Sequence, residues 1–260
     1  MTIDLLLLSV IQGISEILPI SSSVNLHFFS SLFHINDFSF SLKVALHAGS
    51  LLTLIVYFRK EISHIFKGLF TKKIRLSDTH FFPLLFGTIP VVIFGFLARD
   101  FVKEFDSPKI MGICSILFGL LLLSFDKISG QKLRTDKTPV SIIKAFIIGC
   151  FQTIAIFPGV SRLGICLTAS RMLALDRKKA IMFSLFLAIP SICGSLTLEL
   201  LECYKNNTFG TFANESLFGI LLTSVIGLIA IWPCVKYMER HGFFALTIYR
   251  ILIGIAIFFI

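Results

Sequence analysis

Residues 12–25 read QGISEILPISSSVN, a polar stretch around one proline inside an otherwise apolar N-terminal region. A second stretch of this kind, FPGVSRLG, occupies residues 157–164. Proline removes a helix hydrogen-bond donor and its ring clashes with the preceding turn. The apolar segments that contain these stretches, about 1–33 and 141–175, are therefore predicted to form two short helices each, joined at an irregular tip. Re-entrant helical hairpins fit this pattern better than full membrane spans.

The composition predicts an integral membrane protein. Of the 260 residues, 55% are hydrophobic and only 15% are charged, against roughly 25% charged residues in an ordinary soluble domain. The mean hydropathy is +0.89. The formal net charge of +9 is interpreted as basic cytoplasmic loops near anionic lipid headgroups, and not as a nucleic-acid surface. The six cysteines occur singly, without metal-ligand spacing, and are predicted to be small core residues.

Six further segments approach the roughly 20 apolar residues that a membrane span needs. They are residues 40–58, 81–101, 110–125, 180–201, 216–236 and 243–260. If these six cross the membrane and both hairpins return to their side of entry, most of the 24 Lys and Arg residues lie on one side, in loops 59–80, 126–144, 171–179 and 236–242. Because cytoplasmic loops are rich in Lys and Arg, both termini are predicted to be extracytoplasmic.

The same layout occurs twice along the chain. Residues 1–125 and 139–260 each contain a hairpin followed by three spans, with a polar linker at 126–138. LPISS is echoed by FPGVSR, and FGTIPVVIFG by FLAIPSICG. Because three is odd, the second copy enters the membrane from the opposite face, which predicts an inverted-topology repeat. The fold class is thus a single all-α polytopic membrane domain; two kinked stretches without any symmetry are the alternative.

Charged side chains at the two tips are candidates for function. A carboxylate or guanidinium at membrane depth is costly unless it is paired or faces water, and Glu16 and Arg162 are the residues in question. Backbone N–H groups from Gly159 to Ser161 would form a concave anion site at the start of a helix, and Arg162 would add bidentate contacts to phosphate oxygens. The alternative is a purely structural ion pair between Arg162 and Glu16.

The first tip offers groups that could act on a phosphate. Gln12 and Glu16 lie four residues apart, on one face of a helix. Glu16 is predicted to act as a general base or to bind a divalent cation that holds phosphate oxygens. Ser21, Ser22 and Ser23 supply hydroxyl groups that could hydrogen-bond the phosphate or attack it. Alternatively, these serines cap the helix that restarts after the proline.

Other ionisable residues in the predicted spans include His47, Glu199 and Arg250. His47 either faces the site or packs between helices, while Glu199 and Arg250 are predicted to be interfacial or paired.

The two tip motifs, together with ALHAGSLLTLIVYFRKEI and LDRKKAIMFSLFLAIPSICG, resemble the undecaprenyl pyrophosphate phosphatase family, also called bacitracin-resistance proteins. The resemblance covers nearly the whole chain in order. It implies hydrolysis of undecaprenyl diphosphate to the monophosphate carrier used in cell-wall synthesis, in a bacterial cytoplasmic membrane, supported by Mg²⁺ or Ca²⁺. It also implies six spans and two re-entrant hairpins. The family motifs correspond here to Gln12, Glu16, Ser21, Ser22, Ser161 and Arg162.

The chain departs from the family pattern at three positions. Asn25 stands where the family commonly has a histidine, and an amide cannot carry protons near neutral pH. His27 lies about 200° further round a helix and is a poor substitute. Leu163 and Cys166 replace a Ser and a Thr. These changes predict a thinner polar shell around Glu16 and Arg162, and a slow or metal-reliant hydrolase in preference to an inactive one.

The resulting hypothesis is a lipid-diphosphate phosphatase with Glu16, Ser22 and Arg162 as catalytic residues. Gln12, Ser21, Asn25, Gly159 and Ser161 are assigned to substrate binding, and Glu16 to a divalent cation. The expected partners are a polyprenyl diphosphate and membrane lipids, with no nucleic acid; a homodimer is left open. A polyprenyl-phosphate transporter or flippase is the competing hypothesis, because inverted repeats with broken helices are typical of transporters. A catalytically weakened homologue is the third.

Overall fold

The computed structural model describes residues 3–35, 40–71, 81–98, 101–102, 104–130, 140–205 and 214–260. All regular structure in these ranges is helical. The helices are α1 (Ile3–Ser15), α2 (Ser22–Leu32), α3 (Phe40–Tyr57), α4 (Arg59–Thr71), α5 (Phe81–Leu97), α7 (Pro108–Gly130), α8 (Ile142–Gln152), α9 (Arg162–Met172), α10 (Arg177–Lys205), α11 (Asn214–His241) and α12 (Phe244–Ala256). Short 3₁₀ turns, Thr153–Ile156 and Ile257–Phe259, follow α8 and α12.

The helix lengths identify a multi-pass membrane protein. Within the described ranges, α3, α7, α10 and residues 216–241 of α11 are long and apolar enough to cross a bilayer. The predicted spans at 81–101 and 243–260 correspond to the shorter apolar helices α5 and α12. Large apolar side chains stay exposed on the outer surface, such as Phe94 and Trp232, which is what contact with lipid requires.

Two predicted loops are partly helical. Helix α7 continues to Gly130, so the first residues of the predicted linker 126–138 belong to it, while 131–138 lie outside the described residues. The prediction treated the polarity of Asp126 as the start of a loop, but this side chain is buried and bound by arginines from α9 and α10. Similarly, α4 occupies the beginning of the predicted loop 59–80.

Each polar stretch separates two short helices, as predicted. Helices α2 and α9 are both 11 residues long, and each follows a serine with positive φ, Ser21 (64°) and Ser161 (70°). Each also ends before a residue with positive φ, His34 (54°) and Ala174 (58°). The interval along the chain from Ser21 to Ser161 equals that from His34 to Ala174, so the two segments follow the same backbone course.

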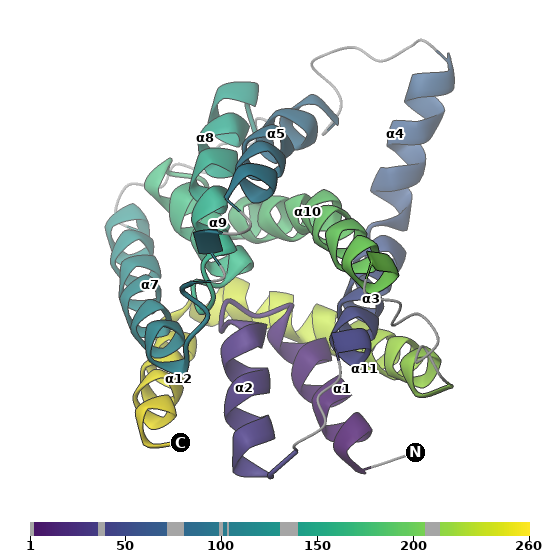
Figure 1. Ribbon diagram of the computed structural model, residues 1–260. Helices are drawn as coiled ribbons and strands as arrows, with labels where there is room; N and C mark the ends of the chain where they lie inside the picture. The colour runs from purple at the N-terminus through teal and green to yellow at the C-terminus, as the bar shows by residue number, and fades with distance from the viewer. Residues whose placement is uncertain are drawn as a thin grey trace.

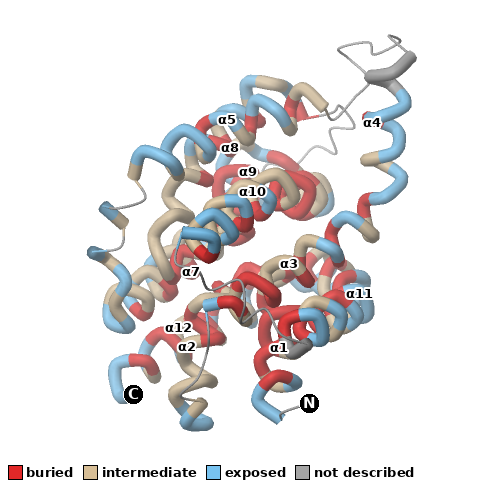
Figure 2. The backbone as a smooth tube through the Cα atoms, turned by 45° about the vertical axis from the view of Figure 1, so that its right-hand side comes forward, coloured by how far each residue is buried: buried red, intermediate tan, exposed pale blue. Residues whose placement is uncertain are grey.

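The helices of the two predicted halves are intertwined. Helix α1 packs against α11, and α8 packs against α5, so the first helix of each hairpin contacts a helix of the other half. Figure 1 shows α1 and α2 at one end of the molecule and α8 at the other, with both chain termini at the end of α1 and α2. Buried residues concentrate towards the middle, around α9 and α10, while α4 extends away from the bundle (Figure 2). The turn between α1 and α2 is called the first turn below, and the turn between α8 and α9 the second turn. Both lie in the buried centre.

Candidate functional site

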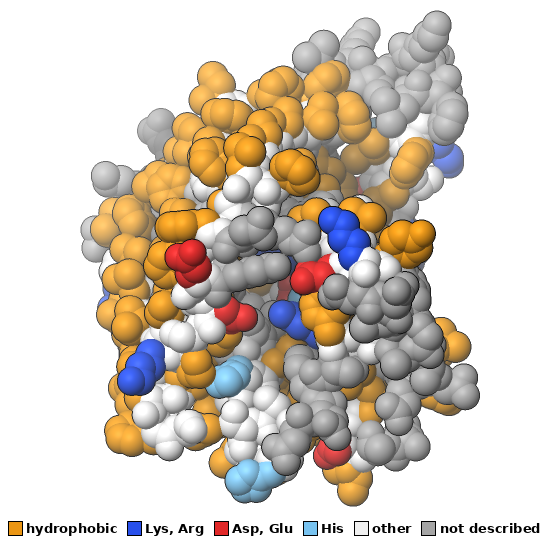
Figure 3. Space-filling model, viewed as in Figure 1, with side chains coloured by type: hydrophobic (Ala, Val, Ile, Leu, Met, Phe, Trp, Pro, Cys, Tyr) orange, Lys and Arg blue, Asp and Glu red, His pale blue; other side chains and the backbone are white. Residues whose placement is uncertain are grey.

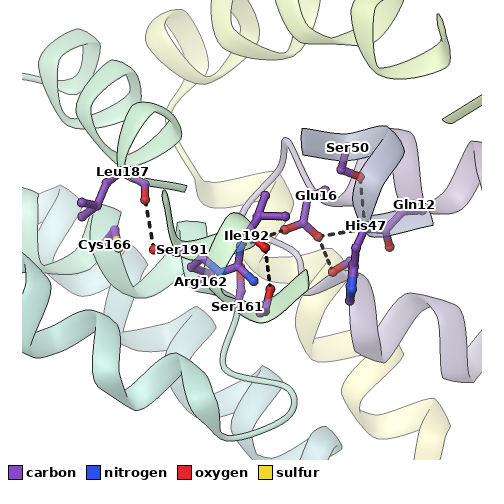
Figure 4. A network of polar contacts seen from close by, with 12 residues as sticks. Gln12, Glu16, His47, Ser50, Ser161, Arg162, Cys166, Leu187, Ser191 and Ile192 are labelled. Carbon is purple, nitrogen blue, oxygen red and sulfur yellow. Dashed lines mark hydrogen bonds and ion pairs between the residues drawn. The ribbon is translucent and has the colours of Figure 1, made fainter. Parts of the chain in front are cut away.

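Glu16 lies just beyond the end of α1 and collects hydrogen bonds from both sides of the first turn. Its backbone N–H donates to Gln12 O at 3.0 Å, which continues the helical pattern past Ser15. Its Oε2 accepts from Ser22 Oγ at 2.7 Å. It also accepts from Gln12 Nε2 at 3.1 Å (Figure 4). Its side chain is 10% exposed. The carboxylate is thus held in place and in direct contact with a hydroxyl group, the arrangement of a base beside a nucleophile.

Arg162 reaches the same carboxylate from the second turn. Its Nη1 lies 3.7 Å from Glu16 Oε1, a distance for an ion pair but too long for a hydrogen bond. Nη1 is buried and has no hydrogen-bond partner in the described protein. Two residues from opposite halves of the sequence therefore meet, and the guanidinium retains an unused donor that an anion could accept from.

Ser22 and Arg162 hold equivalent places in the two turns. Each is the first residue of its helix, directly after a serine with positive φ. A helix N-terminus carries partial positive charge and unpaired N–H groups, so it attracts anions. Since both residues contact Glu16, the N-termini of α2 and α9 converge on one point. In Figure 3, acidic, basic and histidine side chains surround a hollow in the middle of a largely apolar face.

The other residues predicted to bind the substrate make different kinds of hydrogen bond. Gln12 Nε2 also donates to Ser50 Oγ at 3.2 Å, and Gln12 Oε1 is buried without a hydrogen-bond partner among the described residues. Ser21 Oγ pairs with Ser23 Oγ at 3.1 Å and makes no capping bond, which contradicts the capping alternative for its side chain. Ser161 Oγ does cap α9, because it accepts from the Gly164 N–H at 3.1 Å.

Gly159 permits the sharp second turn. Its φ is +91°, and a Cβ at this position would lie 2.4 Å from Met111 O. Of the three N–H groups predicted to bind phosphate, that of Val160 donates to Phe157 O at 3.4 Å within the turn.

The side chain of Asn25 is hydrogen-bonded to the first turn and to α12. Its Nδ2 donates to Ile20 O at 3.0 Å and to Ser21 O at 2.8 Å, and its Oδ1 accepts from the Tyr249 hydroxyl. Both polar atoms of its side chain therefore have protein partners. Its predicted contact with substrate stays a prediction.

The two other departures from the family pattern are packed inside the protein. Leu163 is 4% exposed and Cys166 is fully buried. Cys166 Sγ donates to Gln152 Oε1 at 3.1 Å, and Gln152 Nε2 donates to Ser191 Oγ at 2.7 Å. Gln152 follows Gln12 by the same interval that separates the two turns, and each glutamine donates to a serine of a long helix, Ser50 of α3 or Ser191 of α10. Cys166 thus belongs to a buried packing network, and not to the groups around Glu16.

Two further groups near the turns were only partly anticipated. His47 Nδ1 lies 3.2 Å from Glu199 Oε1, so Glu199 is paired as predicted. Arg250 is 1% exposed, and its guanidinium donates to Pro19 O, Gly159 O and Val160 O. The interfacial alternative for Arg250 is therefore wrong, since its partners are buried backbone carbonyls. A charge in the middle of an apolar helix was the signal that could have identified it.

The first turn contains oxygen atoms suited to a divalent cation shared with a phosphate. Within the described ranges, no group of three or more His, Cys, Asp or Glu side chains could hold a metal by itself. Mg²⁺, however, is commonly bound through one or two carboxylates plus substrate phosphates. The Glu16 carboxylate and the unpartnered Gln12 Oε1 fit that requirement.

Comparison with known proteins identifies the family. The sequence model of the family described as bacitracin resistance protein BacA matches residues 5–256, which is nearly the whole chain. The chain belongs to the BacA family.

Similar relatives cover nearly the whole chain. Undecaprenyl-diphosphatase 3 of Bacillus cereus (strain ATCC 10987) is 31% identical over 98% of this chain and 95% of the relative. Undecaprenyl-diphosphatase 4 of Bacillus thuringiensis (strain Al Hakam) is 32% identical with the same coverage. The undecaprenyl-diphosphatase of Alcanivorax borkumensis is 32% identical over 98% of this chain and 97% of the relative. The family resemblance read from the tip motifs is confirmed.

Proposed function

We propose that this chain hydrolyses undecaprenyl diphosphate to undecaprenyl phosphate and inorganic phosphate, and so returns the lipid carrier to cell-wall synthesis. The family membership supports this activity, because relatives that match 98% of the chain are named undecaprenyl-diphosphatases. The observation that carries the proposal is the convergence of three groups: the carboxylate of Glu16, just beyond the end of α1, the hydroxyl of Ser22, at the start of α2, and the guanidinium of Arg162, at the start of α9.

The proposed topology has six membrane crossings and two re-entrant hairpins in one domain of a bacterial cytoplasmic membrane. Helices α3, α5, α7, α10, α11 and α12 would cross, and the pairs α1–α2 and α8–α9 would enter and return. Two observations support an inverted repeat of residues 1–125 and 139–260. The two turns follow the same backbone course, and both chain termini lie at the same end of the molecule. In such repeats the ligand site lies near the midplane, where broken helices meet.

In the proposed mechanism, the terminal phosphate lies between the turns. Glu16 Oε2 removes a proton from Ser22 Oγ, already hydrogen-bonded at 2.7 Å, or from a water molecule in its place. The deprotonated oxygen attacks the terminal phosphorus, and the bond to the bridging oxygen breaks, so that undecaprenyl phosphate leaves. Attack by water gives inorganic phosphate directly, whereas attack by Ser22 gives a phosphoserine ester that a water molecule then hydrolyses to inorganic phosphate and free Ser22. Arg162, through its unused donor, stabilises the charge on the transferred phosphoryl group.

A divalent cation, Mg²⁺ or Ca²⁺, would be held by Glu16 and Gln12 Oε1. It would neutralise phosphate charge and help to orient the diphosphate. The polyprenyl tail would extend into lipid past the exposed apolar side chains.

Release of phosphate from undecaprenyl diphosphate by purified protein in detergent, with and without Mg²⁺ or Ca²⁺, tests the activity. We expect release by the wild type and a loss of about 10²–10⁴-fold in Glu16→Gln, since general bases contribute that much. His27→Ala is the matched control, because the described contact of His27 is made by its backbone carbonyl, which accepts from Ser30 Oγ and stays in the variant. Absence of release under every metal condition would reject the enzyme and favour a transporter.

Ser22→Ala distinguishes the two candidate nucleophiles. Loss of activity comparable to that of Glu16→Gln assigns the attack to Ser22 Oγ. Retention of most activity assigns it to water.

A further inference from the structure

Arg250 lies where the backbones of both turns approach α12. Its Nη1 donates to Pro19 O at 3.2 Å, and its Nη2 donates to Gly159 O at 3.1 Å and to Val160 O at 3.0 Å. Pro19 and Gly159 are separated by the same interval as Ser21 and Ser161, so this one guanidinium binds the equivalent carbonyl of each turn. No other described side chain is hydrogen-bonded to both turns in this way.

Two glycines leave space for the side chain of Arg250. A Cβ on Gly164 would lie 2.9 Å from Arg250 Nη1, and one on Gly119 would lie 3.4 Å from Arg250 Nε. Helix α12 is fixed to α7 at the same level, because Ser115 Oγ donates to Arg250 O and Thr247 Oγ1 donates to Gly119 O. The guanidinium therefore has a defined position from which to hold the turns.

The guanidinium of Arg250 is hydrogen-bonded to neutral carbonyl oxygens and is not paired with an acid. Among the described residues it forms no ion pair, and its Nε has no hydrogen-bond partner. A buried ion pair with a carboxylate would be the ordinary structural use of a buried arginine. This guanidinium instead adds an unneutralised positive charge next to a site proposed to bind a diphosphate.

The carbonyl contacts also orient the peptide groups of the second turn. The chain has no cis peptide bond in the described residues, and in a trans peptide the N–H points opposite to the C=O. With Val160 O directed at Arg250, the Ser161 N–H is directed away from it. Carbonyl oxygens would repel a phosphate. Those of Pro19, Gly159 and Val160 instead point towards α12, where they accept from Arg250.

The neighbouring residue reinforces this arrangement. The Tyr249 hydroxyl donates to Asn25 Oδ1, and Asn25 Nδ2 in turn holds Ile20 O and Ser21 O. Three consecutive carbonyls of the first turn, from Pro19 to Ser21, are therefore bound by side chains linked to α12 or belonging to it.

We propose that Arg250 is a positioning residue that holds the two turns in register by their carbonyl oxygens, so that Ser22 and Glu16 face Arg162 and the Ser161 N–H across the phosphate. This inference rests on the proposed function for its kinetic consequence, but its geometric part stands independently. It assigns to Arg250 no direct contact with the substrate.

The kinetic test compares Arg250→Lys with Arg171→Lys. Lysine keeps the charge but cannot span three carbonyls, and a displacement of about 1 Å at a reacting group can cost 10²-fold in rate. We expect kcat for undecaprenyl diphosphate to fall about 100-fold in Arg250→Lys while KM changes little. Arg171 is the matched control, since it is equally buried but bonds Asp126 and Leu175 O at the far end of α9. Per folded protein, Arg171→Lys should keep nearly the wild-type kcat.

A cross-linking test measures the register of the turns without activity. Glu16→Cys and Arg162→Cys are combined in a background whose six native cysteines are replaced by alanine. A short bifunctional thiol reagent should cross-link this pair when Arg250 is present, several-fold less after Arg250→Ala, and undiminished after Arg171→Ala.

The two tests separate the inference from the proposed function. A wild-type protein that releases no phosphate rejects the activity, and cross-linking still decides the role of Arg250. Equal cross-linking with and without Arg250, or no cross-linking in the protein that contains it, overturns the inference. So does an equal loss of kcat in Arg250→Lys and Arg171→Lys, because that outcome reflects general destabilisation only.

Discussion

At the scale of single residues, the site depends on which atoms remain unused after the protein has satisfied its own hydrogen bonds. Arg162 Nη1 and Gln12 Oε1 are both buried and lack hydrogen-bond partners among the described residues, and both side chains contact Glu16. Leaving a buried polar group unpaired is costly in a folded protein. One donor and one acceptor left open at the same point indicate a ligand that offers both kinds of partner, as a phosphate with a bound cation does.

Arg162→Lys tests whether Arg162 is more than an ion-pair partner of Glu16. Lysine keeps the charge and can still pair with the carboxylate, but it loses the planar fork that binds phosphate oxygens. We expect kcat/KM to fall about 10²-fold, the usual cost of removing one transition-state donor, with little change in the melting temperature. Activity kinetics and thermal unfolding in detergent measure the two effects. Wild-type activity in Arg162→Lys would favour the purely structural ion pair.

Asn25→Ala should destabilise the fold through the first turn. The substitution removes the side-chain partner of Ile20 O, Ser21 O and the Tyr249 hydroxyl. A buried group left unpaired costs about 1–3 kcal/mol. Thermal unfolding should reveal this loss, and Tyr249→Phe should reduce the additional cost of Asn25→Ala, because the two residues share a hydrogen bond. Strictly additive effects would contradict this coupling.

At the scale of helices, close packing between α5 and α8 fixes the position of the second hairpin. A Cβ on Gly149 would lie 2.2 Å from Gly87 O, and one on Gly87 would lie 3.1 Å from Ala145 O. Small residues at such contacts let membrane helices approach closely. The hairpin α8–α9 can therefore reach the centre only because these two positions lack side chains.

Gly149→Ala should lower the free energy of unfolding by about 1–3 kcal/mol, the usual cost of overpacking a close contact. Gly95→Ala on α5 is the matched control, because nothing lies within 4 Å of a Cβ there. In that variant the stability should stay the same or rise slightly, since alanine favours a helix over glycine. Thermal unfolding of both proteins compares them. An equal effect at both positions would show that the α5–α8 contact is not limiting.

At the scale of the whole molecule, a buried ionic cluster joins the end of the first half to the second. Asp126 on α7 accepts from Arg171 Nε at 2.8 Å and from Arg177 Nη2 at 2.8 Å, on α9 and α10. Gly242, with φ +71°, leaves room for the Arg177 guanidinium, because a Cβ at residue 242 would lie 2.7 Å from Arg177 Nη2. This cluster ties the helix that precedes the linker to the far end of α9.

Asp126→Asn should destabilise the protein by about 3–5 kcal/mol, since removing one partner of a buried ion pair leaves charge uncompensated. The melting temperature in detergent should fall clearly. The activity per folded protein should be retained, because the cluster lies at the opposite end of α9 from Arg162. A selective loss of kcat without loss of stability would contradict this assignment and connect the cluster to the chemistry.

Much of this organisation is readable from local patterns. Apolar runs of membrane-span length predict the helices. Pro19 and the pair Pro158-Gly159 predict the breaks, because these residues act on their own backbone. The ends of the helices were less predictable. Asp126 continues α7 only because arginines distant in the sequence bind it, and no local pattern contains that information.

By itself, the sequence determined the membrane class, the two broken segments, the family and the identity of the acidic and basic tip residues. These follow from composition, from residues near one another in the chain, or, for the family, from the order of several short motifs along it. Only the tertiary structure decided that Ser22 donates to Glu16, that Asn25 and Cys166 form hydrogen bonds inside the protein, and that Arg250 binds both turns. Those contacts depend on how α2, α9 and α12 pack together, and that packing brings together groups up to 231 residues apart.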